Sequence, residues 1–195
     1  MKAYYDRRAP EYDDVYLGTG LFADRDRPGW HEDVASLREV VASLPPRRTL
    51  DVACGTGFLT RHIPGEIVGL DQSAAMLEIA RQRVPHATFV HADALELPFA
   101  DGSFDRIFTS WFYCHLEESE RVRFLAEARR VAPELVVVGS RVRGDAELVQ
   151  CQERALRDGS RWLVYKRLFE PEALAAELGC GRVLYSGSWF VVVRA

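Results

Sequence analysis

The sequence predicts an α/β fold with an open, mostly parallel sheet, helices on both of its faces and an antiparallel strand at its C-terminal end. Up to residue 140, short apolar runs alternate with helical patterns, which is typical of parallel β-α-β units. Two further apolar runs lie within 183–193, on either side of Ser186-Gly187-Ser188, and predict a hairpin. Five parallel strands and this hairpin make a sheet of seven strands.

The expected elements follow one another along the chain in a regular order. The parallel strands are predicted at 49–53, 67–71, 88–92, 104–110 and 135–140. A helix begins near Asp33 and ends at Pro45-Pro46, and a short one ends at Pro64-Gly65. Ser73 caps a helix that ends near Pro85. Further helices are predicted over about 118–131, about 145–157 and 171–178, and the crossover before the fourth strand is mostly loop.

Size and composition indicate one domain. The chain has 195 residues, of which 48% are apolar and 28% charged, and it carries no linker-like tract. We divide it into N-terminal helices or a lid (1–44), a core (45–140), a substrate cap (141–169) and a C-terminal helix with hairpin (170–195). Residues 1–30 are aromatic and charged, which predicts one or two loosely packed helices.

The net charge, the cysteines and the lengths of the apolar runs also narrow the kinds of partner that we expect. A formal net charge of −4 does not favour nucleic acid as a partner. The four cysteines form no C-x-x-C pair, so no metal site is predicted and a reducing cytoplasm is expected. No apolar run approaches the roughly 20 residues of a membrane span, and no leader is recognisable. We expect a cytoplasmic monomer or homodimer without a membrane partner.

The glycines come where a parallel sheet binds its ligands, beyond the carboxyl end of the first strand. Residues 50–58, L-D-V-A-C-G-T-G-F, predict a strand, a tight turn and a helix start, and the glycines let backbone come close to a ligand. A G-x-G turn alone is a weak signal. Thr60 occupies the third glycine position of G-x-G-x-x-G, which argues against a nicotinamide dinucleotide.

Two acidic residues at strand ends sharpen this prediction. Asp71 closes the second strand, where a carboxylate accepts hydrogen bonds from ribose hydroxyls. Asp93 follows the third strand, where it can accept a hydrogen bond from an adenine amine. Each aspartate alone is more often a helix cap, so the hypothesis of an adenosine site depends on finding both together with the glycine turn.

Four segments then carry a family resemblance: L-D-V-A-C-G-T-G at 50–57, V-G-L-D at 68–71, H-A-D-A at 91–94 and L-P-F-A-D-G-S-F-D at 97–105. In order and spacing they resemble the motifs of class I S-adenosylmethionine-dependent methyltransferases with a Rossmann-like fold, and are similar to the ubiquinone/menaquinone group. Y-Y-D-R-R-A-P-E-Y-D at 4–13 extends the resemblance weakly. The resemblance implies S-adenosyl-L-methionine as cofactor, with tyrosines covering it, and these cofactor residues: Tyr5, Tyr12, Asp51, Ala53, Gly55, Gly57, Asp71, Gln72, Met76, Asp93, Ala94 and Ser110.

The sequence identifies the methyl acceptor less clearly than the methyl donor. Transfer from a sulfonium needs mainly a nucleophile positioned in line, and His115, just past the fourth strand, is the candidate general base. A histidine without a catalytic role is the plainer interpretation of that residue. The candidate substrate residues are Trp30, His31, Trp111, Tyr113 and Arg141.

Several functions stay open at this point. A small-molecule methyltransferase is the main hypothesis, because residues 109–112, T-S-W-F, lack the Asn/Asp-Pro-Pro-Tyr motif of enzymes that methylate exocyclic amines of nucleobases or amides. An RNA or protein methyltransferase and a non-catalytic S-adenosylmethionine-binding protein are the alternatives. Basic residues in 141–169 indicate either an anionic substrate or a solvated helix face.

Overall fold

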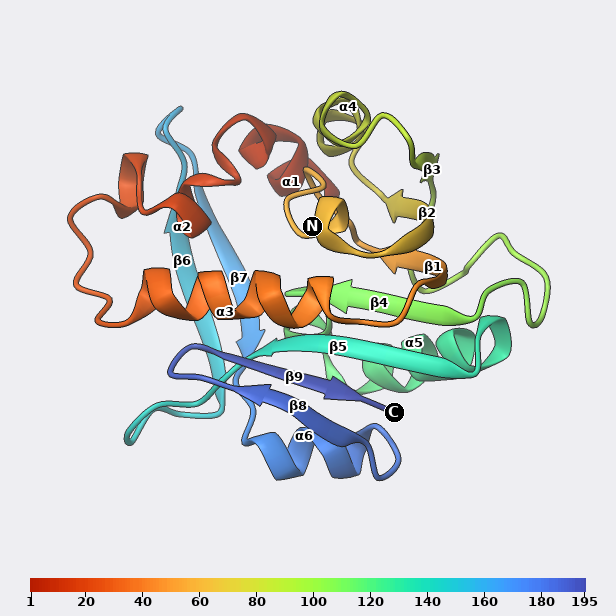
Figure 1. Cartoon of the computed structure of the whole chain (residues 1–195). Coiled ribbons are helices and arrows are strands. Elements are labelled where there is room, and N and C mark those ends of the chain that lie inside the picture. The colour runs from red at the N-terminus through yellow and green to blue at the C-terminus, as the bar shows by residue number, and fades with distance from the viewer.

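The computed structural model, which describes residues 1–195, is built around a sheet of seven strands (Figure 1). In chain order these are β1 (Arg47–Val52), β2 (Gly65–Asp71), β3 (Thr88–His91), β4 (Arg106–Ser110), β5 (Glu134–Ser140), β8 (Arg182–Ser186) and β9 (Phe190–Arg194). Their spatial order is β3-β2-β1-β4-β5-β9-β8. The first five pair in parallel, and β9 runs antiparallel to both β5 and β8. The predicted fold class is confirmed.

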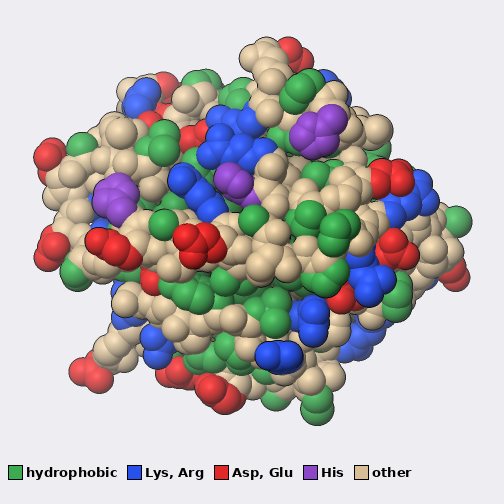
Figure 2. Space-filling view, viewed as in Figure 1, with side chains coloured by type: hydrophobic (Ala, Val, Ile, Leu, Met, Phe, Trp, Pro, Cys, Tyr) green, Lys and Arg blue, Asp and Glu red, His purple; other side chains and the backbone are tan.

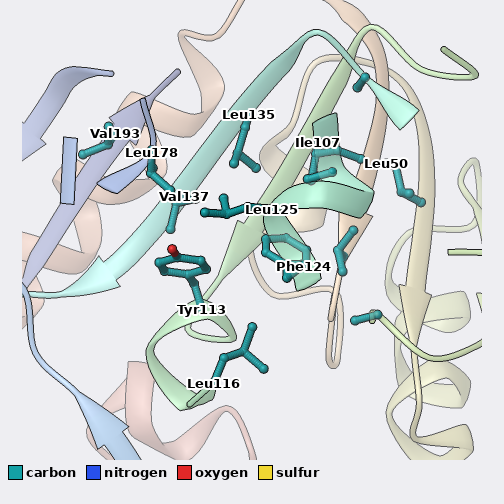
Figure 3. Packing of buried hydrophobic residues seen from close by; sticks show 14 of the residues in the cluster. Leu50, Ile107, Tyr113, Leu116, Phe124, Leu125, Leu135, Val137, Leu178 and Val193 are labelled. Carbon is teal, nitrogen blue, oxygen red and sulfur yellow. The ribbon is translucent and has the colours of Figure 1, made fainter. Parts of the chain in front are cut away.

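Helices cover both faces of this sheet. On one face lies α3 (Trp30–Ala42), and on the other lie α5 (Glu118–Val131) and α6 (Pro171–Glu177) (Figure 1). Side chains alternate along β5 accordingly, since a strand points successive residues to opposite faces. Val137 belongs to the cluster that includes Phe124 of α5, which Figure 3 shows, whereas Val136 belongs to the cluster that includes Leu37 of α3.

A fourth helix, α4 (Ala74–Arg83), contacts β2 and β3 and begins where the second strand ends. The Ser73 hydroxyl caps it by accepting a hydrogen bond from the Met76 amide at 3.2 Å, as predicted. The predicted helix before Pro64-Gly65 is only a 3-10 turn, η3 (Thr60–His62). Because strand order reverses between β1 and β4, the loops after these strands border a crevice at the carboxyl edge of the sheet.

The N-terminal residues form the predicted helices. They comprise α1 (Lys2–Arg8), the 3-10 turn η1 (Ala9–Glu11), α2 (Asp14–Leu17) and the 3-10 turn η2 (Gly20–Phe22). The prediction that they pack loosely is wrong, since Tyr4 is 0% exposed and Tyr16 is 2% exposed. Their aromatic rings are buried against later parts of the chain.

One predicted element is contradicted by the structure. The helix expected over 145–157 is instead a strand, β6 (Val149–Ala155), paired antiparallel with β7 (Arg161–Arg167) in a separate hairpin. Exposure alternates along β6 with the period of a strand, and Asp158-Gly159 lies at the turn. Gly159 has φ +82°, a conformation in which glycine avoids strain, so Asp-Gly was the hairpin signal that the helical interpretation missed.

The hairpin and the N-terminal helices pack together. Tyr4 of α1 shares a small apolar cluster with Leu156 and Val164, and its ring centroid lies 5.7 Å from that of Trp162 (Figure 1). No helix of the structure is both long and apolar enough to cross a membrane. No group of three or more histidine, cysteine, aspartate or glutamate side chains is arranged to hold a metal ion.

Candidate functional site

A cavity lies at the carboxyl edge of β1, β2 and β4, roofed by the N-terminal segment, and encloses about 520 Å³ of empty space that is partly open to solvent. Ten of the twelve predicted cofactor residues line it: Tyr5, Tyr12, Ala53, Gly55, Asp71, Gln72, Met76, Asp93, Ala94 and Ser110. Leu70, Trp111 and Phe112 complete the wall, and none of the three is among the predicted cofactor residues. Asp51 and Gly57 are the two that do not line the cavity.

The turn after β1 brings backbone to the cavity wall. Ala53 and Gly55 have φ values of +57° and +55°, in the left-handed region that side chains disfavour. A Cβ on Gly55 would lie 3.4 Å from the Tyr12 ring, so a larger side chain there would enter the space below this lid tyrosine. Gly57 has a structural role instead, because its missing Cβ lets the turn pack closely on Ala80 of α4.

The carboxylate of Asp71 ties the ends of two loops together. Its Oδ2 accepts a hydrogen bond from the Gly55 amide at 2.9 Å and its Oδ1 accepts one from the Ser73 amide at 2.8 Å. Burial raises the pKa of this carboxyl, and the two amides oppose that rise. A carboxylate oxygen has a second lone pair, so Asp71 can still accept hydrogen bonds from a ligand in the cavity.

Asp51 lies deeper, at the end of β1, and is 2% exposed. Its Oδ2 accepts a hydrogen bond from the Thr60 hydroxyl at 2.6 Å, whereas its Oδ1 is buried without any partner. The pKa of Asp51 is raised to about 7, mainly by burial; the hydrogen bond from the Thr60 hydroxyl opposes the rise and the nearby Asp71 contributes to it. A buried carboxylate oxygen without a donor is costly and fits a site that receives a positively charged group.

Asp93 is placed differently from the other two carboxylates. It is exposed, follows β3, and its Oδ1 accepts a hydrogen bond from the Leu95 amide at 2.9 Å. Its Oδ2 makes no hydrogen bond within the protein and so is free to accept one from a ligand in the cavity.

Two aspartates of the N-terminal segment fasten it over the site. Asp6 accepts a hydrogen bond from the Ser73 hydroxyl at 2.6 Å, at the start of α4. Asp13 accepts one from the Thr56 hydroxyl at 2.6 Å and forms an ion pair with Arg83. The sequence pattern at 4–13 includes both aspartates, but their role depends on partners about 40 to 70 residues away. We name this set of contacts the lid latch.

A second, wider cavity adjoins the first and shares Trp111 with it, with about 1320 Å³ of empty space that is partly open to solvent. Trp111 has φ +58°, an uncommon conformation for a residue with a large side chain, at the point where β4 ends. Of the predicted substrate residues, Trp30 and Trp111 line this second cavity.

The other predicted substrate residues lie elsewhere. His31 is exposed and lines neither cavity. Tyr113 is 0% exposed in the core (Figure 3). Its hydroxyl donates a hydrogen bond to Glu177 at 2.7 Å. Arg141 donates from Nη1 to the Gly187 carbonyl at 2.7 Å, beside the last strands. The sequence placed Tyr113 and Arg141 just after predicted strands, but neighbouring residues there point in different directions.

His115, the candidate base, also lines neither cavity. Its Nδ1 is 2.7 Å from the Tyr165 carbonyl oxygen, a distance at which it donates a hydrogen bond when protonated there. Burial, with Arg154 nearby, lowers the pKa of His115 to about 3, so its ring is neutral at physiological pH. A role as general base stays a prediction.

Comparison with known proteins shows which domain and fold the chain resembles. Residues 50–134 match the sequence profile of a family described as "Methyltransferase domain". The solved DhpI-SAM-HEP complex has the same fold, with a TM-score of 0.75 at 22% identity over 99% of this chain and 94% of that one. Over residues 50–134 the chain is therefore similar to this methyltransferase domain, and the whole chain has the fold of the DhpI-SAM-HEP complex.

Two relatives are more specific in name. Over 132 residues the chain is 39% identical to the demethylmenaquinone methyltransferase of Thermotoga maritima, covering 65% of this chain and 54% of that protein. Over 134 residues it is 33% identical to the enzyme of the same name from Renibacterium salmoninarum, covering 67% of this chain and 53% of that protein. The chain thus spans about half the length of these curated relatives.

Proposed function

We propose that this protein transfers a methyl group from S-adenosyl-L-methionine to a small-molecule acceptor by direct in-line displacement. The observation that carries this proposal is the first cavity, in which the glycine turn, Asp71 and Asp93 come together at the carboxyl edge of the sheet. That edge, where strand order reverses, is where open α/β sheets bind their ligands.

The residues of the site fit the parts of this cofactor. Asp71, with lone pairs left on both oxygens, would accept hydrogen bonds from ribose hydroxyls, and Asp93 would accept one from the adenine amine. Asp51 does not itself line the cavity, but it lies two residues before Ala53, which does, and its unpartnered Oδ1 would receive the ammonium group of the methionine portion. Backbone at Gly55 leaves room for that portion below Tyr12.

Bound S-adenosylmethionine supplies a methyl group already activated on a sulfonium, so the chain itself has mainly to bind and orient the reactants. Positioning of this kind supplies roughly 7–11 kcal/mol of a bimolecular barrier. Aromatic faces at Tyr5, Tyr12 and Trp111 favour a positively charged group beside them and keep water away from it. The shared wall at Trp111 leads to the second cavity, where the acceptor would lie.

The second cavity and the surface charges also bear on the alternative functions, a non-catalytic binding protein and an RNA methyltransferase. A protein that only binds the cofactor needs no second cavity beside the first, whereas here a second cavity shares Trp111 with the first. Figure 2 shows one group of basic side chains on the visible face and elsewhere basic and acidic side chains interspersed, which does not favour an RNA substrate. The acceptors named for the relatives do not carry over directly, because the family match ends at residue 134, before β6 and β7.

A pair of glycine variants tests the cofactor assignment. Gly55→Val places a branched side chain in the cavity, and Gly102→Val places one at φ +65° with no neighbour within 4 Å of the new Cβ. Both impose similar backbone strain, so differences in affinity report on the cavity alone. We expect Gly55→Val to weaken binding of S-adenosylhomocysteine by at least about tenfold in calorimetry, and Gly102→Val to leave it unchanged. Equal affinities in both folded variants would contradict the assignment.

Methyl transfer itself is tested with labelled S-adenosylmethionine and a panel of small phenols, carboxylates, phosphonates and amines. We expect label to move to at least one acceptor with the wild-type chain and not with Gly55→Val. Tight binding of S-adenosylhomocysteine without transfer to any member, in a panel that also includes RNA and protein extracts, would favour a non-catalytic binding protein instead.

A further inference from the structure

The second cavity combines positive charge with aromatic surface. Its walls come from α1, the segment before α3, the end of β5, the β6–β7 hairpin and the start of β9. Six cationic side chains line it, namely Arg8, Arg25, Arg27, Arg143, Arg154 and Lys166. Only two carboxylates, Glu11 and Glu153, line it with them. This excess of positive charge is local, because the chain as a whole has a formal net charge of −4.

The two carboxylates do not neutralise the cations of the cavity. Glu11 forms its ion pair with Arg157, and Glu153 forms its ion pair with Arg161, and neither arginine lines the cavity. None of the six lining cations forms an ion pair with any carboxylate of the chain. In contrast, Arg7, Arg157 and Arg161, which do not line the cavity, each form an ion pair with a carboxylate. The structure therefore leaves a set of positive charges without counter-charge around one cavity.

Aromatic rings hold several of these cations in place. The guanidinium of Arg143 lies 3.5 Å from the ring centroid of Trp189, and that of Arg27 lies 4.1 Å from that of Trp30. Arg8, which is 6% exposed, donates a hydrogen bond to the Tyr4 hydroxyl and lies over the Tyr12 ring. Cation–π contacts fix the position of a guanidinium without cancelling its charge, so these groups can still attract an anion.

Lys166 connects this charge to the shared wall. Its Nζ lies 5.8 Å from the ring centroid of Trp111, the residue common to both cavities. The pKa of Lys166 is lowered to about 8, mainly by burial; the nearby Cys114 opposes this shift, and Arg154, Arg143 and Arg8 contribute to it. Mutual repulsion of this kind costs free energy that a bound anion would recover.

The aromatic part of the wall suits a flat apolar group. Trp30 packs edge-on against Trp111 and Trp189, with ring centroids 5.9 Å and 5.2 Å apart. An acceptor that lies against Trp111 is therefore next to the first cavity, and its charged end can reach the cations of the hairpin.

We propose that the methyl acceptor is a small molecule with an apolar, flat body and an anionic group, a carboxylate or a phosphoryl-type group, which the unpaired cations of the second cavity hold. This proposal rests on the proposed function, and it makes the acceptor unlike a neutral quinone, which would leave all six cations without a counter-charge. Lys166 and Arg154 are the residues assigned to the anionic group.

Binding of matched probes in the presence of saturating S-adenosylhomocysteine tests this proposal. The probes are 1-naphthoate, 1-naphthylphosphonate and the neutral 1-naphthamide, and quenching of tryptophan fluorescence reports their binding because three tryptophans line the cavity. We expect at least one anion to bind at least about tenfold more tightly than the amide, and the ratio between carboxylate and phosphonate to identify the preferred group.

Variants then assign the effect to the cavity. Lys166→Gln and Arg154→Gln are each expected to weaken anion binding by about tenfold while leaving amide binding unchanged, and Lys166→Arg is expected to retain it. Arg7→Gln is the matched control, because Arg7 precedes Arg8 on α1 but forms an exposed ion pair with Asp158. It should behave as wild type. Circular dichroism and S-adenosylhomocysteine affinity show which variants are folded.

The outcomes separate the two proposals. Failure of the wild-type chain to bind S-adenosylhomocysteine would overturn the proposed function. Normal binding of S-adenosylhomocysteine, together with an amide that binds as tightly as both anions, would overturn the anionic acceptor alone. Equal losses for anion and amide in the folded Lys166→Gln and Arg154→Gln variants would also overturn it.

Discussion

Replacing Asp71 with alanine removes the group on which both the loops and the proposed ribose contact depend. The carboxylate is 7% exposed and accepts hydrogen bonds from the Gly55 and Ser73 amides. Without it, two backbone N–H groups at the edge of the cavity lose their partners. Each buried group left without a partner costs about 1–3 kcal/mol, so we expect a clear fall in the free energy of unfolding.

The expected loss of free energy of cofactor binding is similar to the cost of one unpartnered buried group. Hydrogen bonds from hydroxyl groups to a charged acceptor contribute about 1–3 kcal/mol. Asp71→Ala is therefore expected to weaken S-adenosylhomocysteine binding by about 5- to 150-fold. Titration calorimetry measures this affinity, and urea unfolding without ligand measures the stability, so that the two effects are separated.

Asp105→Ala is the matched control for this experiment. Asp105 is exposed at the opposite end of the sheet, where it also accepts a hydrogen bond from a backbone amide, that of Arg48, at 3.0 Å. Its loss should leave the affinity for S-adenosylhomocysteine unchanged. A folded Asp71→Ala variant with wild-type affinity would refute the assignment of Asp71 to the ribose.

Three further predictions follow from the site. Burial raises the pKa of Asp51 to about 7, and an ammonium group favours the ionised form of this carboxyl. Affinity for S-adenosylhomocysteine should therefore rise with pH up to about 7 and level off above it. Asp51→Asn should abolish that rise in calorimetry. Asp13→Asn removes the ion pair of the lid latch and weakens its bond to Thr56, so trypsin should cleave the N-terminal segment faster and cofactor affinity should fall by a few-fold, whereas unchanged cleavage would contradict the latch. His115→Ala should keep turnover within a few-fold, since its ring contacts the Tyr165 carbonyl and lines neither cavity; a loss of about 100-fold with intact cofactor affinity would instead establish a catalytic base.

The outcome for the central sheet shows which parts of the fold can be predicted from sequence. Its strands are short apolar runs separated by helices with their own start and stop residues, such as the Ser73 cap, and each signal lies within a few residues. The prediction was wrong for the hairpin of β6 and β7, because its period-two pattern is mixed with charged residues that also suit a solvated helix. Only pairing with the partner strand, together with the Asp158-Gly159 turn, decides between the two.

The sequence by itself determined the cofactor side of this protein. The glycine turn and the aspartates that end or follow β2 and β3 stand at strand ends, and parallel strands bring such ends to one edge of the sheet whatever the rest of the chain does. Tertiary structure alone decided the acceptor side. There, Trp30, Trp111 and Lys166 come from the start of α3, the end of β4 and from β7, which are brought together only in the folded chain. Whether a cation has a counter-charge depends on such long-range packing, and no local pattern encodes it.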